Sequence, residues 1–165
     1  MTFTARLIDV GMDGARQSHL ENIETVDLVP GQDREIWQSF ETDTGVPFYP
    51  GPGESLFRFF ILPPPDDALS LGDVHAIADQ FFQQNGIEHC RGEASRNPFM
   101  HATPTTDCVM LLSGHVQLLL DHGAPVDLRP FDVIRQRETN HSWVNVGPGP
   151  AVLITLMHGV PAGIV

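Results

Sequence analysis

The feature that most constrains the fold is a series of short apolar runs near the C-terminal end. From residue 107 to 159, the stretches DCVMLLSG, HVQLLLDHG, PVDLRP, DVIRQR, HSWVNV and AVLITLMHG follow one another with only turns between them. Short apolar or alternating runs punctuated by turn residues are typical of β-strands. A parallel sheet would need helices between such strands, so this spacing predicts an antiparallel sandwich or barrel.

The N-terminal part carries further strand signals. The segments RLIDV (6–10), IETVDLV (23–29) and SLFRFFIL (55–62) are each followed by Gly or Pro. Glycine and proline are so frequent over 44–55 and 63–67 that we expect loops there.

One helix is predicted between these two β-rich regions. In the segment DDALSLGDVHAIADQFFQQNGIEH, apolar side chains recur at helical spacing at Val74, Ile77, Ala78, Phe81 and Phe82. We expect a short peripheral helix over 73–85, with Asp73 as its N-cap and Gly86 as its stop. The two phenylalanines would dock this helix onto the barrel.

The length of 165 residues, 41% of them hydrophobic, suits one domain with a sizeable core. We therefore predict a single domain over 1–165. Its expected parts are N-terminal strands and loops over 1–66, the helix and a connector over 67–99, and the main barrel half over 100–160.

The formal net charge of −12 disfavours nucleic acid and anionic membrane surfaces as partners. No apolar run approaches the roughly 20 residues that a membrane-spanning helix needs. The opening MTFTARLIDV lacks the basic and apolar regions of a secretory signal. We expect a cytoplasmic protein in which Cys90 and Cys108 are reduced and buried.

A carboxylate begins the strand expected after residue 106. Alternation places Asp107 on the same face as Val109 and Leu111, and both faces of this strand are nearly apolar. An unpaired buried charge is costly, so Asp107 requires a partner. His101 lies six residues before Asp107, and His141 lies on a second predicted strand.

Two imidazoles and one carboxylate that converge can bind a metal ion. A set of two histidines and one carboxylate suits Fe(II), with Mn, Ni or Zn as alternatives. A hydrogen-bonded polar cluster without metal is the other interpretation of the same residues. No short, specific metal signature such as HExxH is present to decide between them.

The region 100–158 resembles the conserved half of a cupin. His101 matches the first histidine of the first cupin motif, Thr103 stands where a second histidine is usual, and Asp107 replaces the usual glutamate. Gly114 follows at the expected distance. The second motif ends in a histidine, three residues and an asparagine, which His141 and Asn145 match.

The chain is also similar to a subgroup of single-domain cupins of largely unassigned function. This subgroup has a histidine, threonines, an aspartate and a QRGTNHxWxN-like segment, and REIWQSF and SLFRFFILPPP fit its N-terminal region. Three positions depart from the general cupin pattern: Phe131 and Glu138 replace glycines, and Gln136 replaces a proline. We expect turns without their glycine to take another shape.

The resemblance implies an all-β double-stranded β-helix, the jelly-roll or cupin barrel. It further implies a metal-dependent enzyme of the lyase, decarboxylase or isomerase kind, acting on a small organic acid or carbonyl compound. The alternatives are a non-catalytic cupin that binds a sugar or acid, and an Fe-dependent dioxygenase. Relatives of this kind commonly pair through their N-terminal strands, which implies a homodimer.

Each candidate residue has an expected role under this resemblance. His101, Asp107 and His141 would hold the metal, and Glu138 or Asn145 would transfer a proton or orient the substrate. The substrate pocket would be lined by Thr103, Thr105, Gln136 and Trp143.

Overall fold

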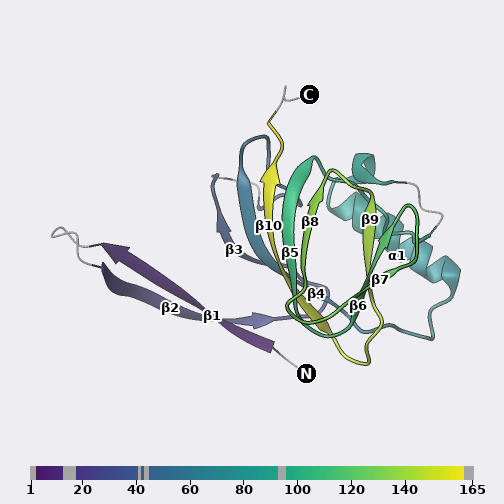
Figure 1. The fold of residues 1–165 in the computed structure, drawn as a ribbon, viewed down its shortest axis with the longest axis horizontal. Helices are drawn as coiled ribbons and strands as arrows, with labels where there is room; N and C mark the ends of the chain where they lie inside the picture. The colour runs from purple at the N-terminus through teal and green to yellow at the C-terminus, as the bar shows by residue number, and fades with distance from the viewer. Residues whose placement is uncertain (1–2, 13–17, 41, 43–44, 93–95, 162–165) are drawn as a thin grey trace.

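The computed structural model describes residues 3–12, 18–40, 42, 45–92 and 96–161. Its body is a β-barrel with a helix against one side, and a two-stranded arm extends away from the opposite side (Figure 1). Every paired strand in the described chain is antiparallel to its neighbour. The predicted all-β barrel with one peripheral α-helix is therefore confirmed.

Two sheets form the barrel. The larger has the spatial order β3 (Arg34–Gln38), β4 (Ser55–Leu62), β10 (Ala151–Gly159), β5 (Thr105–Ser113) and β8 (Val133–Arg137). The smaller has the order β7 (Val126–Leu128), β6 (Val116–Leu120) and β9 (His141–Asn145). Each of the six C-terminal apolar runs thus forms one strand, β5 to β10. Strand β3 was not predicted.

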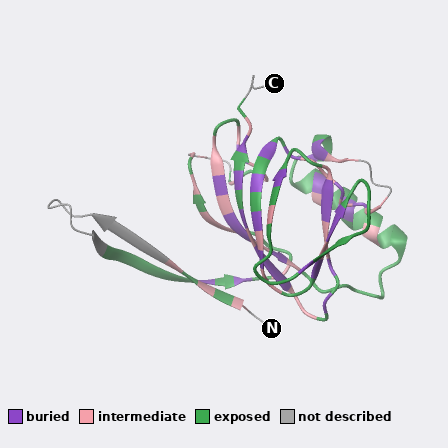
Figure 2. Ribbon diagram, viewed as in Figure 1, coloured by how far each residue is buried: buried purple, intermediate pink, exposed green. Residues whose placement is uncertain are grey.

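The arm consists of β1 (Phe3–Met12) and β2 (Ser18–Leu28), with a register shift after Asp9. Its base is buried against the outer face of the larger sheet, where Val26 and Leu28 share a cluster with Phe59 and Ile61. From Leu20 to Thr25 the side chains of β2 are exposed (Figure 2). A two-stranded hairpin is marginally stable by itself, so the contacts at its base hold the arm to the body.

The main apolar core lies between the two sheets. Its buried members come from both sheets and are Val109, Leu111, Val116, Leu118, Leu128, Ala151 and Leu153. On β5 the side chains at 105, 107, 109 and 111 are buried, which is the alternation expected of a strand with one face toward the core.

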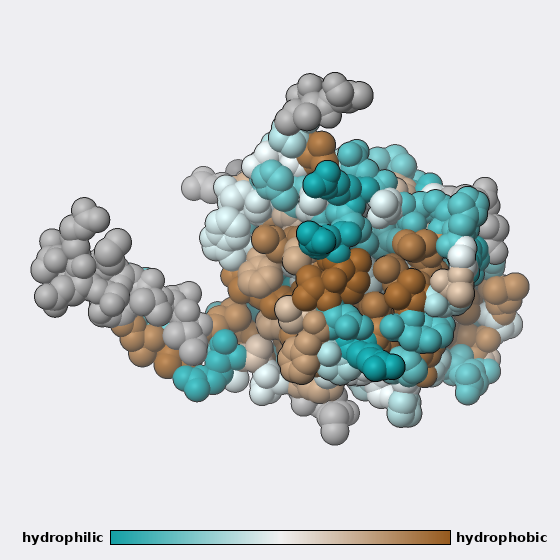
Figure 3. All heavy atoms as spheres, viewed as in Figure 1, coloured by the Kyte–Doolittle hydropathy of each residue, from teal (hydrophilic) through white to brown (hydrophobic). Residues whose placement is uncertain are grey.

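The two cysteines have different surroundings. Cys90 is buried, as predicted, but Cys108 is exposed. The prediction for Cys108 is wrong because its position on β5 turns it to the outer face of the sheet. Apolar side chains also gather across the middle of the visible face of the body (Figure 3). On the outer face of the larger sheet, Leu156 and Val133 are exposed.

Helix α1 (Leu71–Gln84) begins two residues earlier than predicted. Its N-cap is Ser70, and Asp73 is the reciprocal member of a capping box in which each side chain accepts from the other residue's backbone N–H. Gly86 follows the helix with a φ of 64°, as expected of a glycine stop. Ala78 and Phe82 are the buried contacts. No helix in the described ranges is long and apolar enough to cross a membrane.

The turns at residues 114, 131 and 138 bear on the expectation that a turn without its glycine takes another shape. Gly114 has a φ of 98°, and an added Cβ would meet the Cα of Ala151 at 2.6 Å, so this turn requires glycine. Phe131 and Glu138 keep positive φ values of 75° and 44° although neither is glycine. The expectation of another turn shape is wrong there, because surrounding hydrogen bonds hold the left-handed conformation: Phe131 N–H donates to the Leu111 carbonyl.

Candidate functional site

His101 and His141 lie side by side because their backbones form one antiparallel bridge. The N–H of each donates to the carbonyl of the other over 2.9 Å. Directly opposite residues of antiparallel segments place their side chains next to each other. The two imidazole centroids are accordingly 4.6 Å apart, with an angle of 47° between the rings.

Hydrogen bonds at Nδ1 determine the tautomer of both imidazoles. His101 Nδ1 lies 2.8 Å from the Phe99 carbonyl oxygen, and His141 Nδ1 lies 2.8 Å from that of Thr139. A carbonyl oxygen only accepts, so each Nδ1 carries the proton and each Nε2 presents a lone pair. Backbone carbonyl groups that accept from Nδ1 commonly orient reactive or metal-binding histidines in this way.

Burial keeps both imidazoles neutral. The pKa of His101 is lowered to about 4, first by burial and then by nearby His141. Burial also lowers the pKa of His141, which is 2% exposed. At neutral pH the pair therefore offers uncharged hydrogen-bond acceptors.

Asp107 and Gln136 form a second cross-strand pair, on β5 and β8. The Gln136 Nε2 donates to Asp107 Oδ2 over 2.9 Å and to His141 Nε2 over 3.1 Å, so it links the two pairs. Burial raises the pKa of Asp107, and hydrogen bonds from Gln136 and Thr105 oppose that rise. Within the described chain, Asp107 Oδ1 and Gln136 Oε1 are buried without a hydrogen-bond partner.

The remaining predicted pocket residues lie around these pairs. Thr103 and Thr105 are buried, and their hydroxyl groups are 2.7 Å apart and hydrogen-bonded. Trp143 lies next to His141, with ring centroids 5.5 Å apart. The structure therefore brings these residues together with Gln136 at one end of the barrel.

An aromatic wall covers His101. Phe48 and Phe82 contact its ring edge-to-face, at centroid distances of 5.8 and 6.3 Å. Phe81 in turn packs on Phe48 and on Phe99. Since Phe81 and Phe82 belong to α1, the helix closes this end of the barrel with apolar side chains.

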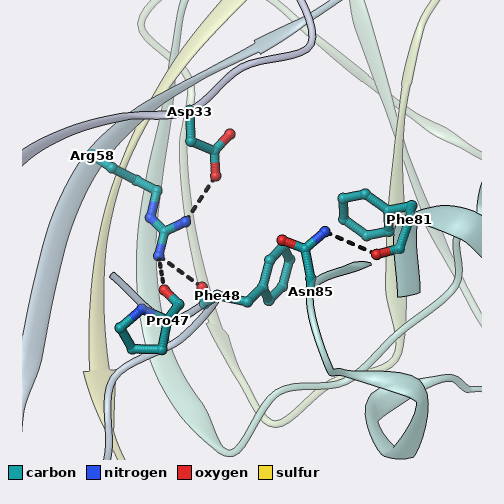
Figure 4. Close-up of polar contacts among 6 residues, drawn as sticks. All are labelled: Asp33, Pro47, Phe48, Arg58, Phe81 and Asn85. Atoms are coloured by element: carbon teal, nitrogen blue, oxygen red, sulfur yellow. Dashed lines mark hydrogen bonds and ion pairs between the residues drawn. The ribbon is translucent and has the colours of Figure 1, made fainter. Parts of the chain in front are cut away.

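Arg58 is a buried residue of this region that the sequence analysis missed. It is 5% exposed, and its Nη1 donates to Asp33 Oδ2 over 2.8 Å. Its Nη2 donates to the carbonyl oxygens of Pro47 and Phe48, also over 2.8 Å (Figure 4). Arg58 thereby holds the segment that places Phe48 against His101.

A sequence signal for Arg58 does exist. Within SLFRFFIL the arginine shares the inward parity of Leu56 and Phe60, where a charged side chain needs partners. Its ion-pair partner Asp33 is also affected, because burial raises the pKa of that carboxyl while Arg58 opposes the rise.

The two residues predicted to be catalytic are not part of this arrangement. Glu138 is exposed in the turn after β8. Asn145 Nδ2 donates to the carbonyl oxygens of Pro63 and Gly149 over 2.9 and 2.8 Å, and its Oδ1 accepts from Gly147 N–H. Asn145 lies at the other end of β9 from His141, and its hydrogen bonds hold loops together. Neither position supports the predicted catalytic role.

The predicted metal ligands do not fit one cation as they are arranged. The amide nitrogen of Gln136 carries hydrogens and lies between His141 Nε2 and Asp107 Oδ2, where a cation bound by both residues would lie. Among the described residues, no three His, Cys, Asp or Glu side chains are grouped so as to hold a metal ion. We therefore derive no chemical step through a metal.

Sequence comparison finds limited similarity. No family model matches the chain. A curated relative, the phomopsin biosynthesis cluster protein C' of Diaporthe leptostromiformis, is 33% identical over 103 residues. This match covers 61% of the chain and 48% of the relative, so the chain spans about half the length of that protein.

Structure comparison finds solved proteins at low sequence identity, two of them described as cupins. An RmlC-like cupin of Methanocaldococcus jannaschii has a TM-score of 0.42, with 11% identity over 76% of this chain and 91% of that one. A cupin of Bacteroides fragilis has a TM-score of 0.38, with 16% identity over 67% and 69% of the two chains. A DMSP lyase of Ruegeria pomeroyi has a TM-score of 0.38, with 13% identity over 64% and 38%.

The strand order of this chain explains where the candidate residues meet. Two facing antiparallel sheets place the first-motif residues His101 and Asp107 beside the second-motif residue His141, at one end of the barrel. The chain therefore forms an antiparallel β-barrel of two facing sheets, with these three residues at one end.

Proposed function

We propose that the chain binds a small polar molecule at the barrel end formed by the pairs His101/His141 and Asp107/Gln136. The observation that supports this is a buried and a half-buried neutral imidazole next to a buried carboxylate, under an aromatic wall. A few convergent polar groups in apolar surroundings are typical of small-molecule sites.

The favoured activity is a lyase, decarboxylase or isomerase step on a small organic acid or carbonyl compound. Such reactions move a proton next to a carbonyl group, which requires a positioned acceptor. His101 supplies one, since its Nδ1 is held by the Phe99 carbonyl and its Nε2 presents a lone pair. A bound anion close to this ring would raise the pKa of His101 and make it a stronger base.

Binding of a sugar or acid without turnover is the second candidate. The pKa of His101, about 4, makes it a weak base in the free protein. His141 Nε2 is already engaged by Gln136. Both observations support this second candidate, in which the imidazoles orient a ligand and take no proton from it. A dioxygenase, the third alternative, would need a metal that displaces the Gln136 amide from its position.

The two candidates are separated by NMR on protein labelled with ¹⁵N-histidine. We would add lactate, pyruvate and glucose in turn, and follow both the imidazole nitrogens and the proton spectrum of each compound. Shifts of the His101 and His141 signals with new product peaks indicate an enzyme, and shifts without product indicate a binding protein.

Matched variants show whether the response comes from the proposed site. His101→Gln should abolish the shifts, whereas His122→Gln, in an exposed turn, should leave them unchanged. If related hydroxy acids, keto acids and sugars also leave His101 and His141 unshifted, or if His101→Gln responds like the wild type, the proposal is wrong.

We also propose a homodimer in which the arm of one copy covers the outer face of the larger sheet of the other. That face has a concavity of about 600 Å³ lined in part by Arg135, Arg137 and Leu156. On β2, Glu21 and Ile23 are exposed and offer complementary charge and apolar surface. Light scattering should give twice the chain mass of 18.2 kDa, and the double variant Arg135→Glu/Arg137→Glu should lower it toward the monomer.

A further inference from the structure

Gln136 has an unusual position between the two halves of the site. Its amide nitrogen is within hydrogen-bond distance of His141 Nε2 on the smaller sheet and of Asp107 Oδ2 on the larger sheet. An amide nitrogen carries two hydrogens, so it can donate to both groups at once. Without this amide group, the lone pairs of His141 Nε2 and Asp107 Oδ2 would face each other.

We propose that the Gln136 amide takes the place of a metal ion and makes this centre metal-independent. A cation between an imidazole lone pair and a carboxylate neutralises their mutual repulsion and joins the ligands. The partly positive NH₂ group of Gln136 does the same with two hydrogen bonds. Position 136 therefore decides whether the centre holds a metal.

The other residues of the site are consistent with an amide group in the place of a metal ion. Thr103 stands where the cupin motif has another histidine, and its hydroxyl is bonded to that of Thr105. Gln136 connects Asp107 to His141. Hydrogen bonds thus join the carboxylate to the imidazole across the two sheets without a cation.

The proposal predicts the effect of removing the donor. Gln136→Glu replaces the NH₂ group by an oxygen, so that two carboxylates and an imidazole lone pair meet in a buried space. Without a cation this variant should be less stable than the wild type, because buried like charges repel. With a cation it should bind and recover stability, since a ligand that binds only the folded state raises the midpoint of unfolding.

Cobalt(II) is the probe, because its visible absorption reports ligand number and its binding also shifts thermal unfolding. We would titrate Co²⁺ into the wild type, Gln136→Glu and Gln136→His, and record absorption and the melting temperature Tm by circular dichroism. We expect Gln136→Glu to bind one equivalent at least about tenfold more tightly than the wild type, with a rise in Tm. Gln136→His adds a metal ligand without a buried charge. It takes the place of Gln136→Glu in the titration if that variant does not fold.

Gln117→Glu is the matched control. Gln117 Nε2 donates to Asp127 Oδ1 over 2.9 Å, the same kind of cross-strand pair, but between β6 and β7 at an exposed position. Because His115 Nε2 also lies 3.7 Å from Asp127 Oδ1, this variant places the same ligand types together in solvent, and it should bind Co²⁺ more weakly than Gln136→Glu does.

Two results would overturn the proposal. One is a wild type that binds one equivalent of Co²⁺ as tightly as Gln136→Glu. The other is a folded variant at position 136 that gains no affinity over the wild type. Neither measurement uses a substrate, so the outcome is independent of whether the proposed small-molecule function is correct.

Discussion

The two ends of the barrel interior are built from the same strands, but one end is packed with apolar side chains and the other consists of hydrogen-bonded polar groups. On β5, Thr105 and Asp107 face inward at one end, and Val109 and Leu111 face inward at the other. The apolar end is a continuous cluster of aliphatic side chains from both sheets. The polar end is a set of hydrogen-bonded pairs, in which the second oxygen of Asp107 and the oxygen of Gln136 are buried without a partner.

Apolar contacts and buried hydrogen bonds contribute differently to the free energy of unfolding. Apolar burial stabilises in proportion to area, about 25 cal/mol per Å², whichever residues supply it. A buried hydrogen bond contributes only about 0.5–1.5 kcal/mol net, and a buried group that loses its partner costs about 1–3 kcal/mol. We therefore expect the apolar end to dominate the free energy of unfolding and the polar end to dominate its pH dependence.

The largest effect should come from the apolar end. Leu153 is fully buried between the sheets. Leu153→Ala removes its packing and leaves a cavity, which should lower the free energy of unfolding by about 4 kcal/mol. Urea unfolding measures this loss, which should be equal at pH 7.5 and pH 5. A loss below about 1 kcal/mol would mean that this end is not the main source of stability.

A loss almost as large should follow the removal of Arg58. Arg58→Met leaves the carbonyl oxygens of Pro47 and Phe48 without their donor and Asp33 without its counter-ion. Breaking such a buried pair costs about 3 kcal/mol, toward the low end because Asp33 is partly exposed.

The matched control for Arg58 is Arg34→Met. Arg34 pairs with Glu24 between the body and the arm, but both side chains are exposed. Urea unfolding should show a loss below about 1 kcal/mol for this variant. Equal losses for the two variants would mean that burial does not distinguish the two ion pairs.

The smallest of the three effects is a pH dependence at the polar end. His101 has a pKa of about 4 in the folded protein and 6.5 as its ordinary value. Between these values the unfolded chain binds the proton and the folded protein does not, so stability is present above pH 6.5 and falls as the pH decreases. From pH 7.5 to 5 the contribution of His101 is a loss of about 2 kcal/mol.

The contribution of His101 is isolated by comparing urea unfolding of the wild type and His101→Gln at both pH values. His141 has a lowered pKa that acts in the same direction, and Asp107 has a raised pKa that acts in the opposite one. Both remain in the variant. The variant should therefore be less sensitive to pH than the wild type. The same sensitivity in both proteins would show that His101 is not buried in its neutral form.

The local sequence pattern was sufficient to predict most of the strands and the helix. Alternation and turn residues placed the six C-terminal strands, and helical spacing located α1. The start of α1 was misplaced because Asp73 is a good N-cap residue by type, yet Ser70 precedes it in a capping box. Cys108 was misjudged because an apolar neighbourhood in the sequence does not say which face of a sheet is covered.

The site was predictable only in part. Motif spacing pointed to His101, Asp107 and His141, and the structure places all three at one end of the barrel. Motif spacing also pointed to Asn145, whose amide instead holds the loops near Pro63 and Gly149. Arg58 was missed because its partners lie on segments that are distant in the sequence.

The sequence by itself determined that this chain forms an antiparallel β-barrel, because strand periodicity and turn residues are local properties. Only the tertiary structure decided what the histidine and carboxylate residues do. The pairing of residues 101 with 141 and 107 with 136 is a matter of register between distant strands. That register puts a glutamine amide between two metal-ligand types, a contact that no spacing along the chain encodes.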